Sequence, residues 1–232
     1  MPNPFSPGKI VKDESFCNRK EEIRRLTGYA LSGVNTVIYS PRRYGKTSLV
    51  KKVQENIVIP SYYCDLFGVV SVKDIINRIV SSILLPMKDK QSLFRKTVDK
   101  FRFLRPSINI DPLTGSYSLS LSMQDDGNTY NNMERLMYAI KELSVQQGNM
   151  LMIFDEFQEI SEIRNSSQIE GVMRSVIQET DDLAFFFIGS RRRLLIEMFT
   201  DKKRPFFSSS ILFELEKIPE KEFVTWIIER FS

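Results

Sequence analysis

The sequence predicts an α/β fold, a three-layer αβα sandwich around a central parallel sheet. Residues 36–65 read as a strand, a helix and a second strand, and a unit of this kind requires parallel strands. Two further apolar runs, at 150–154 and 183–188, have the length and composition of buried strands. A shorter run at 211–215 supplies a fifth strand.

The segments between these strands show the periodicity of amphipathic helices, in which apolar residues recur every three or four positions. Helices are expected from Arg19 to about Leu31, after Gly45, over 72–84, after Pro86, over about 133–143 and over about 223–228. A further helix is expected around 172–177, because Ser167 and Glu170 fit a capping box just ahead of it.

One segment interrupts the alternation of strands and helices. Apolar residues alternate with polar ones at 108–110 and 117–123, on either side of the turn sequence at 111–115. This is the pattern of a β-hairpin. We therefore expect a hairpin inserted at about 105–124 into the α/β domain.

The strongest functional signal is Gly45-Lys46-Thr47, between a β-branched strand and a helix. In a P-loop, backbone N–H groups at a helix N-terminus face the phosphates of a nucleotide. The lysine supplies charge to the β- and γ-phosphates, and the threonine hydroxyl suits Mg²⁺. The alternative is a glycine at an ordinary helix start, followed by surface residues. The nucleotide-binding residues predicted for this loop are Ser40, Pro41, Arg42, Arg43, Tyr44, Gly45, Lys46, Thr47 and Ser48.

A second signal supports the P-loop interpretation. The apolar run 150–154 leads directly into Asp155-Glu156, and open α/β sheets bind ligands at the carboxyl ends of their strands. We expect Asp155 to hold Mg²⁺ together with Thr47, and Glu156 to orient and polarise the attacking water. Alone, an Asp-Glu pair after a strand would more often be an exposed turn.

Ser190 is the third candidate, because it follows Gly189 at the end of the 183–188 run. A small polar group there could contact the γ-phosphate or the attacking water, although Gly-Ser is also an ordinary start of a loop. The catalytic residues predicted from the sequence are Glu156, Lys46 and Ser190.

Composition excludes several other classes of site. The chain has no histidine, so Ser-His-Asp and Cys-His nucleophiles and histidine-containing zinc sites are ruled out. The two cysteines, Cys17 and Cys64, lack a CxxC spacing and fit reduced thiols. The N-terminus lacks the pattern of a signal peptide, and no apolar run is long enough to span a membrane. We expect a cytoplasmic protein without membrane contact.

These motifs resemble the archaeal-type ATPase family of AAA+/STAND-related P-loop NTPases. The resemblance covers nearly the whole chain and is most specific in the stretch Pro41-Arg-Arg-Tyr-Gly-Lys-Thr-Ser-Leu49. The other stretches that carry it are Asn3-Pro-Phe5, Phe16 with Arg19 and Glu22, Asp65-Leu-Phe-Gly68, Asp155-Glu156-Phe157 and Gly189-Ser190.

The resemblance implies more than the motifs do alone. It implies a P-loop NTPase fold of AAA+ type with strand order 5-1-4-3-2, and Ser190 in the sensor position. It places Asn3, Pro4, Phe5, Phe16 and Arg19 near the adenine. It also implies an ATPase domain over 1–217, with 218–232 as the start of a helical lid at which the chain stops.

The sequence departs from the family pattern at two positions near the nucleotide. Ser40 replaces the first glycine of the P-loop, and Asn18 stands where a glycine usually precedes the arginine. Ser can occupy many tight turns, so we expect Ser40 to weaken the loop geometry at most.

The leading interpretation is an ATP-binding, Mg²⁺-dependent ATPase of AAA+/STAND type that acts as a nucleotide-driven switch, with slow turnover in this chain. Its ligands would be ATP or ADP with Mg²⁺, and a protein partner or a second copy of the chain is plausible.

One alternative is a nucleotide-binding scaffold with little turnover. Another is a nucleic-acid-binding module, which would use the basic residues between 88 and 105. With 33 basic and 29 acidic residues, the net charge of +4 does not decide between them. A basic segment at 191–204 would suit a trans-acting arginine, although a solvated or lid-facing surface is the more common meaning for each of its residues.

Overall fold

The structure, a computed structural model, describes residues 16–110, 117–122 and 129–231. Its central sheet contains five strands in the order β2-β5-β6-β1-β7, all parallel, which confirms the predicted order 5-1-4-3-2. The strands are β1 (Thr36–Tyr39), β2 (Ser61–Asp65), β5 (Met150–Asp155), β6 (Leu183–Gly189) and β7 (Ile211–Glu214).

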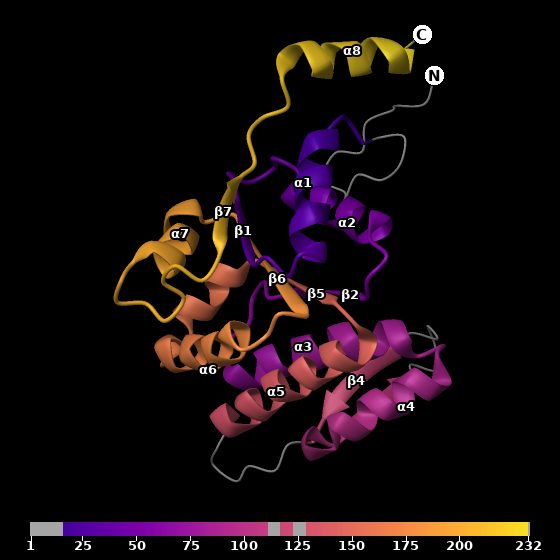
Figure 1. The fold of residues 1–232 in the computed structure, drawn as a ribbon, viewed down its shortest axis with the longest axis vertical. Helices are drawn as coiled ribbons and strands as arrows, with labels where there is room; N and C mark the ends of the chain where they lie inside the picture. Colours follow the sequence, from indigo (N-terminus) through magenta and orange to yellow (C-terminus); the bar gives the residue numbers. More distant parts are fainter. Residues whose placement is uncertain (1–15, 111–116, 123–128, 232) are drawn as a thin grey trace.

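Helices cover both faces of this sheet, as Figure 1 shows, so the expected three-layer sandwich is confirmed. One face packs against α1 (Lys20–Leu31) and α2 (Lys46–Asn56). The other packs against α3 (Val72–Met87), α5 (Thr129–Gln147), α6 (Ser166–Gln178) and α7 (Arg192–Thr200). Successive side chains of β5 and β6 pack alternately into the hydrophobic cores on the two faces of the sheet, because side chains alternate across a strand.

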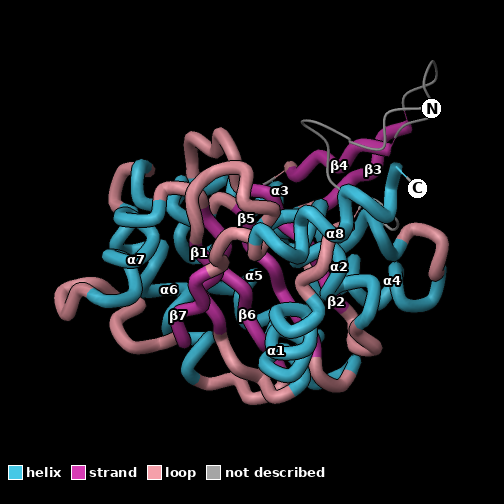
Figure 2. Tube along the Cα trace, turned by 90° about the horizontal axis from the view of Figure 1, so that it is seen from above, coloured by secondary structure: helices cyan, strands magenta, loops and turns pink. Residues whose placement is uncertain are grey.

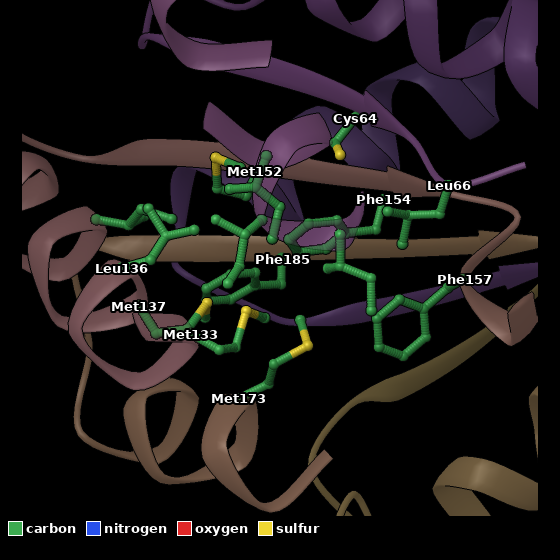
Figure 3. Packing of buried hydrophobic residues seen from close by; sticks show 14 of the residues in the cluster. Cys64, Leu66, Met133, Leu136, Met137, Met152, Phe154, Phe157, Met173 and Phe185 are labelled. Carbon is green, nitrogen blue, oxygen red and sulfur yellow. The ribbon is translucent and has the colours of Figure 1, made fainter. Parts of the chain in front are cut away.

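Aromatic rings fill the core beside the carboxyl end of β5 (Figure 3). The rings of Phe154, Phe185 and Phe187 stack with centroids 6.0–6.1 Å apart, and Phe157 lies 4.5 Å from Phe187. Phe154 and Phe157 are fully buried on either side of Asp155-Glu156. The acidic pair is therefore anchored at both ends by core packing.

The insertion begins after α3. It contains α4 (Gln91–Lys100), a 3-10 helix (Arg102–Leu104) and an antiparallel hairpin of β3 (Pro106–Ile110) and β4 (Tyr117–Leu121). Figure 2 shows the hairpin at the periphery, apart from the central sheet. The expected hairpin is confirmed, while its turn at 111–115 lies outside the described residues.

The last helix, α8 (Glu220–Phe231), lies away from the main body at the end of an extended segment (Figure 1). Its Phe223, Val224 and Ile228 side chains are exposed. The division at 217/218 stays a prediction. None of the described helices combines the length and the apolar character that a membrane crossing requires.

Two local expectations were wrong. Helix α3 continues through Pro86 to Met87, whose side chain is buried, so the next helix begins only at Gln91. Ser167 does not cap α6, because the helix begins at Ser166 after Asn165. Glu170 is instead fully buried and bonded to Arg204.

Candidate nucleotide site at the carboxyl ends of β1, β5 and β6

The P-loop connects the buried strand β1 to helix α2. Gly45 precedes the helix with φ 85°, a left-handed conformation that glycine adopts without strain. The first hydrogen bond of α2 runs from the N–H of Leu49 to the carbonyl of Gly45, at 2.9 Å. Because the backbone N–H groups of Lys46 and Thr47 precede this bond, they lie at the positive end of the helix dipole.

Ser40 is accommodated at the first position of the loop without a left-handed backbone. It is absent from the described residues with positive φ, and its side chain is fully buried. Its hydroxyl lies 3.2 Å from the Lys46 ammonium, which donates to it. The serine therefore adds an acceptor for the lysine at a position where the loop does not need a glycine conformation.

Lys46 is buried within the loop that precedes it. Its ammonium also donates to the carbonyl oxygens of Ser40 and Pro41, at 2.8 and 3.0 Å. Burial lowers the pKa of the Lys46 ammonium, an effect that the carboxylates of Glu156 and Asp155 oppose. The lysine thus lies in the field of both acids.

Asp155 ends strand β5, and its side chain is buried. Its Oδ2 accepts hydrogen bonds from the Thr47 hydroxyl at 2.8 Å and from the Tyr63 hydroxyl at 2.5 Å. Its Oδ1 accepts from the backbone N–H of Glu156 at 2.9 Å. The two residues predicted to hold Mg²⁺ are therefore in direct contact.

Glu156 follows with a left-handed backbone, φ 51°, which turns its side chain toward the end of β6. Its Oε2 accepts from the Ser190 hydroxyl at 2.9 Å and from the Ser190 N–H at 3.3 Å. The guanidinium of Arg42 lies 3.4 Å from the same hydroxyl. The predicted catalytic acid, the predicted sensor residue and the P-loop therefore meet at one edge of the sheet.

The residues expected near the adenine are only partly described. Asn3, Pro4 and Phe5 lie outside the described residues. Phe16 is half-buried against the core beneath α1 and α2. The Arg19 guanidinium is bonded to Glu22 and to the carbonyl of Glu216, each at 2.6 Å.

Three of the six basic residues in the segment that follows β6 form ion pairs within the chain. Arg191 pairs with Glu159 and Glu162, Arg192 with Glu214 at 3.1 Å, and Arg204 with Glu170 at 2.6 Å. These intrachain ion pairs favour a structural role for the three arginines over a role in a neighbouring subunit.

The sequence analysis missed two polar residues that contact the acidic pair. Tyr63 lies on the strand next to β5, two positions before Asp65, which is in register with Asp155. The predicted strand order places these positions on one face, so this contact could have been found. Gln158, in the 3-10 helix η3 (Phe157–Glu162), donates to Glu156 at 2.5 Å, and no sequence pattern indicated it.

The polar groups at this edge suit Mg²⁺. Thr47 and Asp155 offer hydroxyl and carboxylate oxygens, the donor type that this ion prefers. Among the described residues there is no cluster of three His, Cys, Asp or Glu side chains that could hold a metal ion. A site with few protein ligands is typical of Mg²⁺ bound with nucleotide phosphates and water, rather than in an all-protein cage.

No family model and no curated protein matches the chain. Among solved structures it is similar to a Walker-type ATPase of Pyrococcus abyssi, with 20% identity and a TM-score of 0.67, over 98% of this chain and 61% of that one. It is also similar to the ORC2 protein of Aeropyrum pernix in its ADPNP-ADP complexes, with 17% identity and a TM-score of 0.57, over 98% and 55%.

A third similar structure is the Aeropyrum pernix ORC1 protein in complex with DNA, with 14% identity and a TM-score of 0.57, over 97% of this chain and 51% of that one. The chain thus spans between 51% and 61% of the length of these three proteins. It shares the fold of these archaeal proteins, an α/β fold whose central parallel sheet has the strand order that the sequence analysis expected.

Proposed function

We propose that this chain binds ATP and hydrolyses it in a Mg²⁺-dependent reaction, and that it uses the nucleotide state as an AAA+/STAND-type switch. The contact between Thr47 and Asp155 at 2.8 Å, beside a Glu156–Ser190 contact at 2.9 Å, carries this proposal. The two contacts bring two carboxylates and two hydroxyls together at the end of a P-loop. Phosphoryl transfer to water needs ligands for Mg²⁺, for the attacking water and for the γ-phosphate at such a position.

Each side chain has a distinct part in this proposal. The Lys46 ammonium would exchange its loop carbonyls for phosphate oxygens, and Thr47 and Asp155 would hold Mg²⁺. Bound Mg²⁺ would neutralise charge on the β- and γ-phosphates. Glu156 would accept a hydrogen bond from the attacking water, and Ser190 would lie near the γ-phosphate.

The nucleotide-binding scaffold with little turnover is the second candidate, and one observation favours it. In α8, proposed here as the start of a lid that follows an ATPase domain over 1–217, Phe223, Val224 and Ile228 are exposed, and the helix lies away from the main body (Figure 1). Closure of a lid excludes water and speeds many enzymes. We therefore propose slow turnover for residues 1–232 alone, below the roughly 1–100 s⁻¹ typical of kinases.

The test is nucleotide binding by wild-type chain and by Lys46→Ala, read from the melting temperature with and without Mg-ATP. A ligand at 100 times its Kd adds about 2.7 kcal/mol of stability, which gives a clear shift. We expect this shift in the wild type and its loss in Lys46→Ala.

Lys52→Ala is the matched control, because Lys52 lies on the same helix and pairs with Glu55 at 2.9 Å. We expect it to keep the shift. A wild-type chain whose melting temperature responds to no nucleotide would refute the proposed function.

A further inference from the structure

Gln158 is a buried polar residue at this edge of the sheet that the proposed function does not use. It is fully buried, and its amide nitrogen donates to Glu156 Oε2 at 2.5 Å, with Glu159 Oε1 more distant at 3.5 Å. Its amide oxygen is buried without a hydrogen-bond partner. Because a carboxylate only accepts hydrogen bonds, the nitrogen of the amide must be the end that faces Glu156.

The space that Gln158 occupies depends on Gly189. A Cβ atom added to Gly189 would lie 2.0 Å from the Gln158 amide oxygen and 3.0 Å from a methyl group of Leu195. Gly189 is absent from the described glycines with positive φ, so its backbone does not itself require glycine. The missing side chain at position 189 therefore makes room for the amide beneath Glu156.

The hydrogen bonds to Glu156 all converge on one oxygen. Its Oε2 accepts from Gln158 and from both the N–H and the hydroxyl of Ser190, while no described residue donates to Oε1. Three donors on one oxygen fix the rotation of the carboxylate group. Oε1 is then left to accept a hydrogen bond from water.

We propose that Gln158 is a positioning residue, which with Ser190 holds Oε2 of Glu156 so that Oε1 faces the attacking water. This inference rests on the proposed function, since it assigns how the catalytic carboxylate of that site, Glu156, is oriented. A purely structural role does not explain the amide, because an apolar side chain would fill the same space without burying an unpartnered oxygen.

Two variants test the contact from opposite sides. Gln158→Met keeps similar volume but removes the donor, and Gly189→Ala keeps the amide but displaces it. We expect each to lower the single-turnover rate of Mg-ATP hydrolysis about tenfold or more, since a misplaced general base loses part of its usual contribution of about 10²–10⁴. The Kd for a fluorescent ATP analogue should stay within about twofold, because the hydrogen bond between Gln158 and Glu156 does not involve the P-loop.

The double variant Gln158→Met/Gly189→Ala should be no slower than the slower single variant, because both changes break one contact. Gln168→Met is the matched control: it makes the same change at an exposed position of α6 and should leave the rate unchanged. Should Gln158→Met fail to fold, Gly189→Ala provides the same test.

Three results would overturn the inference: an unchanged rate, a faster rate, or a loss of nucleotide affinity equal to the loss of rate. A faster rate would mean that Gln158 restrains Glu156 instead of orienting it. These results differ from a failure of the proposed function, in which the wild-type chain itself would neither bind nor hydrolyse Mg-ATP.

Discussion

Two carboxylates in this fold are buried in very different surroundings. Asp155, at the end of β5, accepts hydrogen bonds from two side-chain hydroxyls and one backbone N–H. Glu170, on α6, has Arg204 as its partner at 2.6 Å, and its second oxygen is buried without a hydrogen bond. Burial raises the pKa of Glu170 to about 7, against the opposing charge of the arginine.

The difference shows what distinguishes a site from an isolated buried charge. Burial disfavours the ionised form of an acid unless hydrogen-bond donors and positive charge compensate for the lost water. At the P-loop edge the chain supplies several donors to each acid, while Glu170 is paired with one arginine, Arg204, which lies between α7 and β7 and whose Nε is itself unpartnered. The fold therefore surrounds the site acids with hydrogen-bond donors, and leaves Glu170 with a raised affinity for a proton.

The largest expected effect concerns the role of Glu156. Glu156→Gln keeps the shape of the side chain but replaces the basic carboxylate that would polarise water with a neutral amide, so turnover should fall by about 100-fold or more, while ATP still binds. Steady-state hydrolysis and the Kd of a fluorescent ATP analogue measure the two effects separately.

Glu162→Gln is the control for this change, because Glu162 ends the short helix that Glu156 precedes, is more exposed and pairs with Arg191. It should retain nearly full activity. Equal loss of nucleotide affinity and of turnover in Glu156→Gln would contradict a role confined to catalysis. Glu156 would then no longer differ from Glu170 in having a catalytic role.

The second effect concerns stability and pH. Because the folded chain binds a proton at Glu170 more tightly than the unfolded chain does, this group stabilises the fold fully below about pH 4.5, and that stabilisation is lost as pH rises through about 7. We expect the wild type to lose roughly 2–3 kcal/mol of unfolding free energy between pH 5 and pH 8 through this group, and Glu170→Gln to remove that loss.

Urea unfolding at several pH values measures this dependence, and the absence of histidine leaves few other groups that titrate in the window. Glu179→Gln is the control, since Glu179 pairs with Lys141 at 3.0 Å but is half-exposed. The same slope in wild type and Glu170→Gln would show that Glu170 is not the group responsible.

Much of the fold could be predicted from the sequence because its core strands carry unambiguous signals. The apolar runs in β1, β5 and β6 are short, continuous and buried on both faces, so their composition and length identify them. Their order came from the family resemblance, because periodicity does not say which strands pair. Pro86 misled the helix assignment, since the burial of Met87 extends α3 beyond the proline.

The candidate site was predictable where a motif fixes both residue type and position. Lys46, Thr47, Asp155, Glu156 and Ser190 all lie at one edge of the sheet for this reason. Gln158 was not predictable, because its contact depends on the 3-10 turn after β5 and on the space beside Gly189. Glu170 was misassigned because a local capping motif and a buried ion pair use the same residue type.

The smallest expected effect concerns one hydrogen-bond donor to Asp155. Tyr63 donates to Asp155 Oδ2 at 2.5 Å, so Tyr63→Phe removes one of the groups that orient this carboxylate, which we propose as a Mg²⁺ ligand. Removing such an outer partner of a metal ligand typically weakens metal affinity about 10–100-fold, and we expect the lower end because Thr47 and a backbone N–H remain. Titration of the nucleotide-loaded chain with Mg²⁺ measures the change.

The neighbouring tyrosine provides a control within the same strand. Tyr62 points to the opposite face of β2, where its hydroxyl donates to Gln147 at 3.0 Å, so Tyr62→Phe loses a similar hydrogen bond far from the acids. It should alter stability by about 1 kcal/mol and leave Mg²⁺ affinity unchanged. If both variants weaken Mg²⁺ equally, the donors at Asp155 contribute only general stability, and the distinction between Asp155 and Glu170 lies in burial alone.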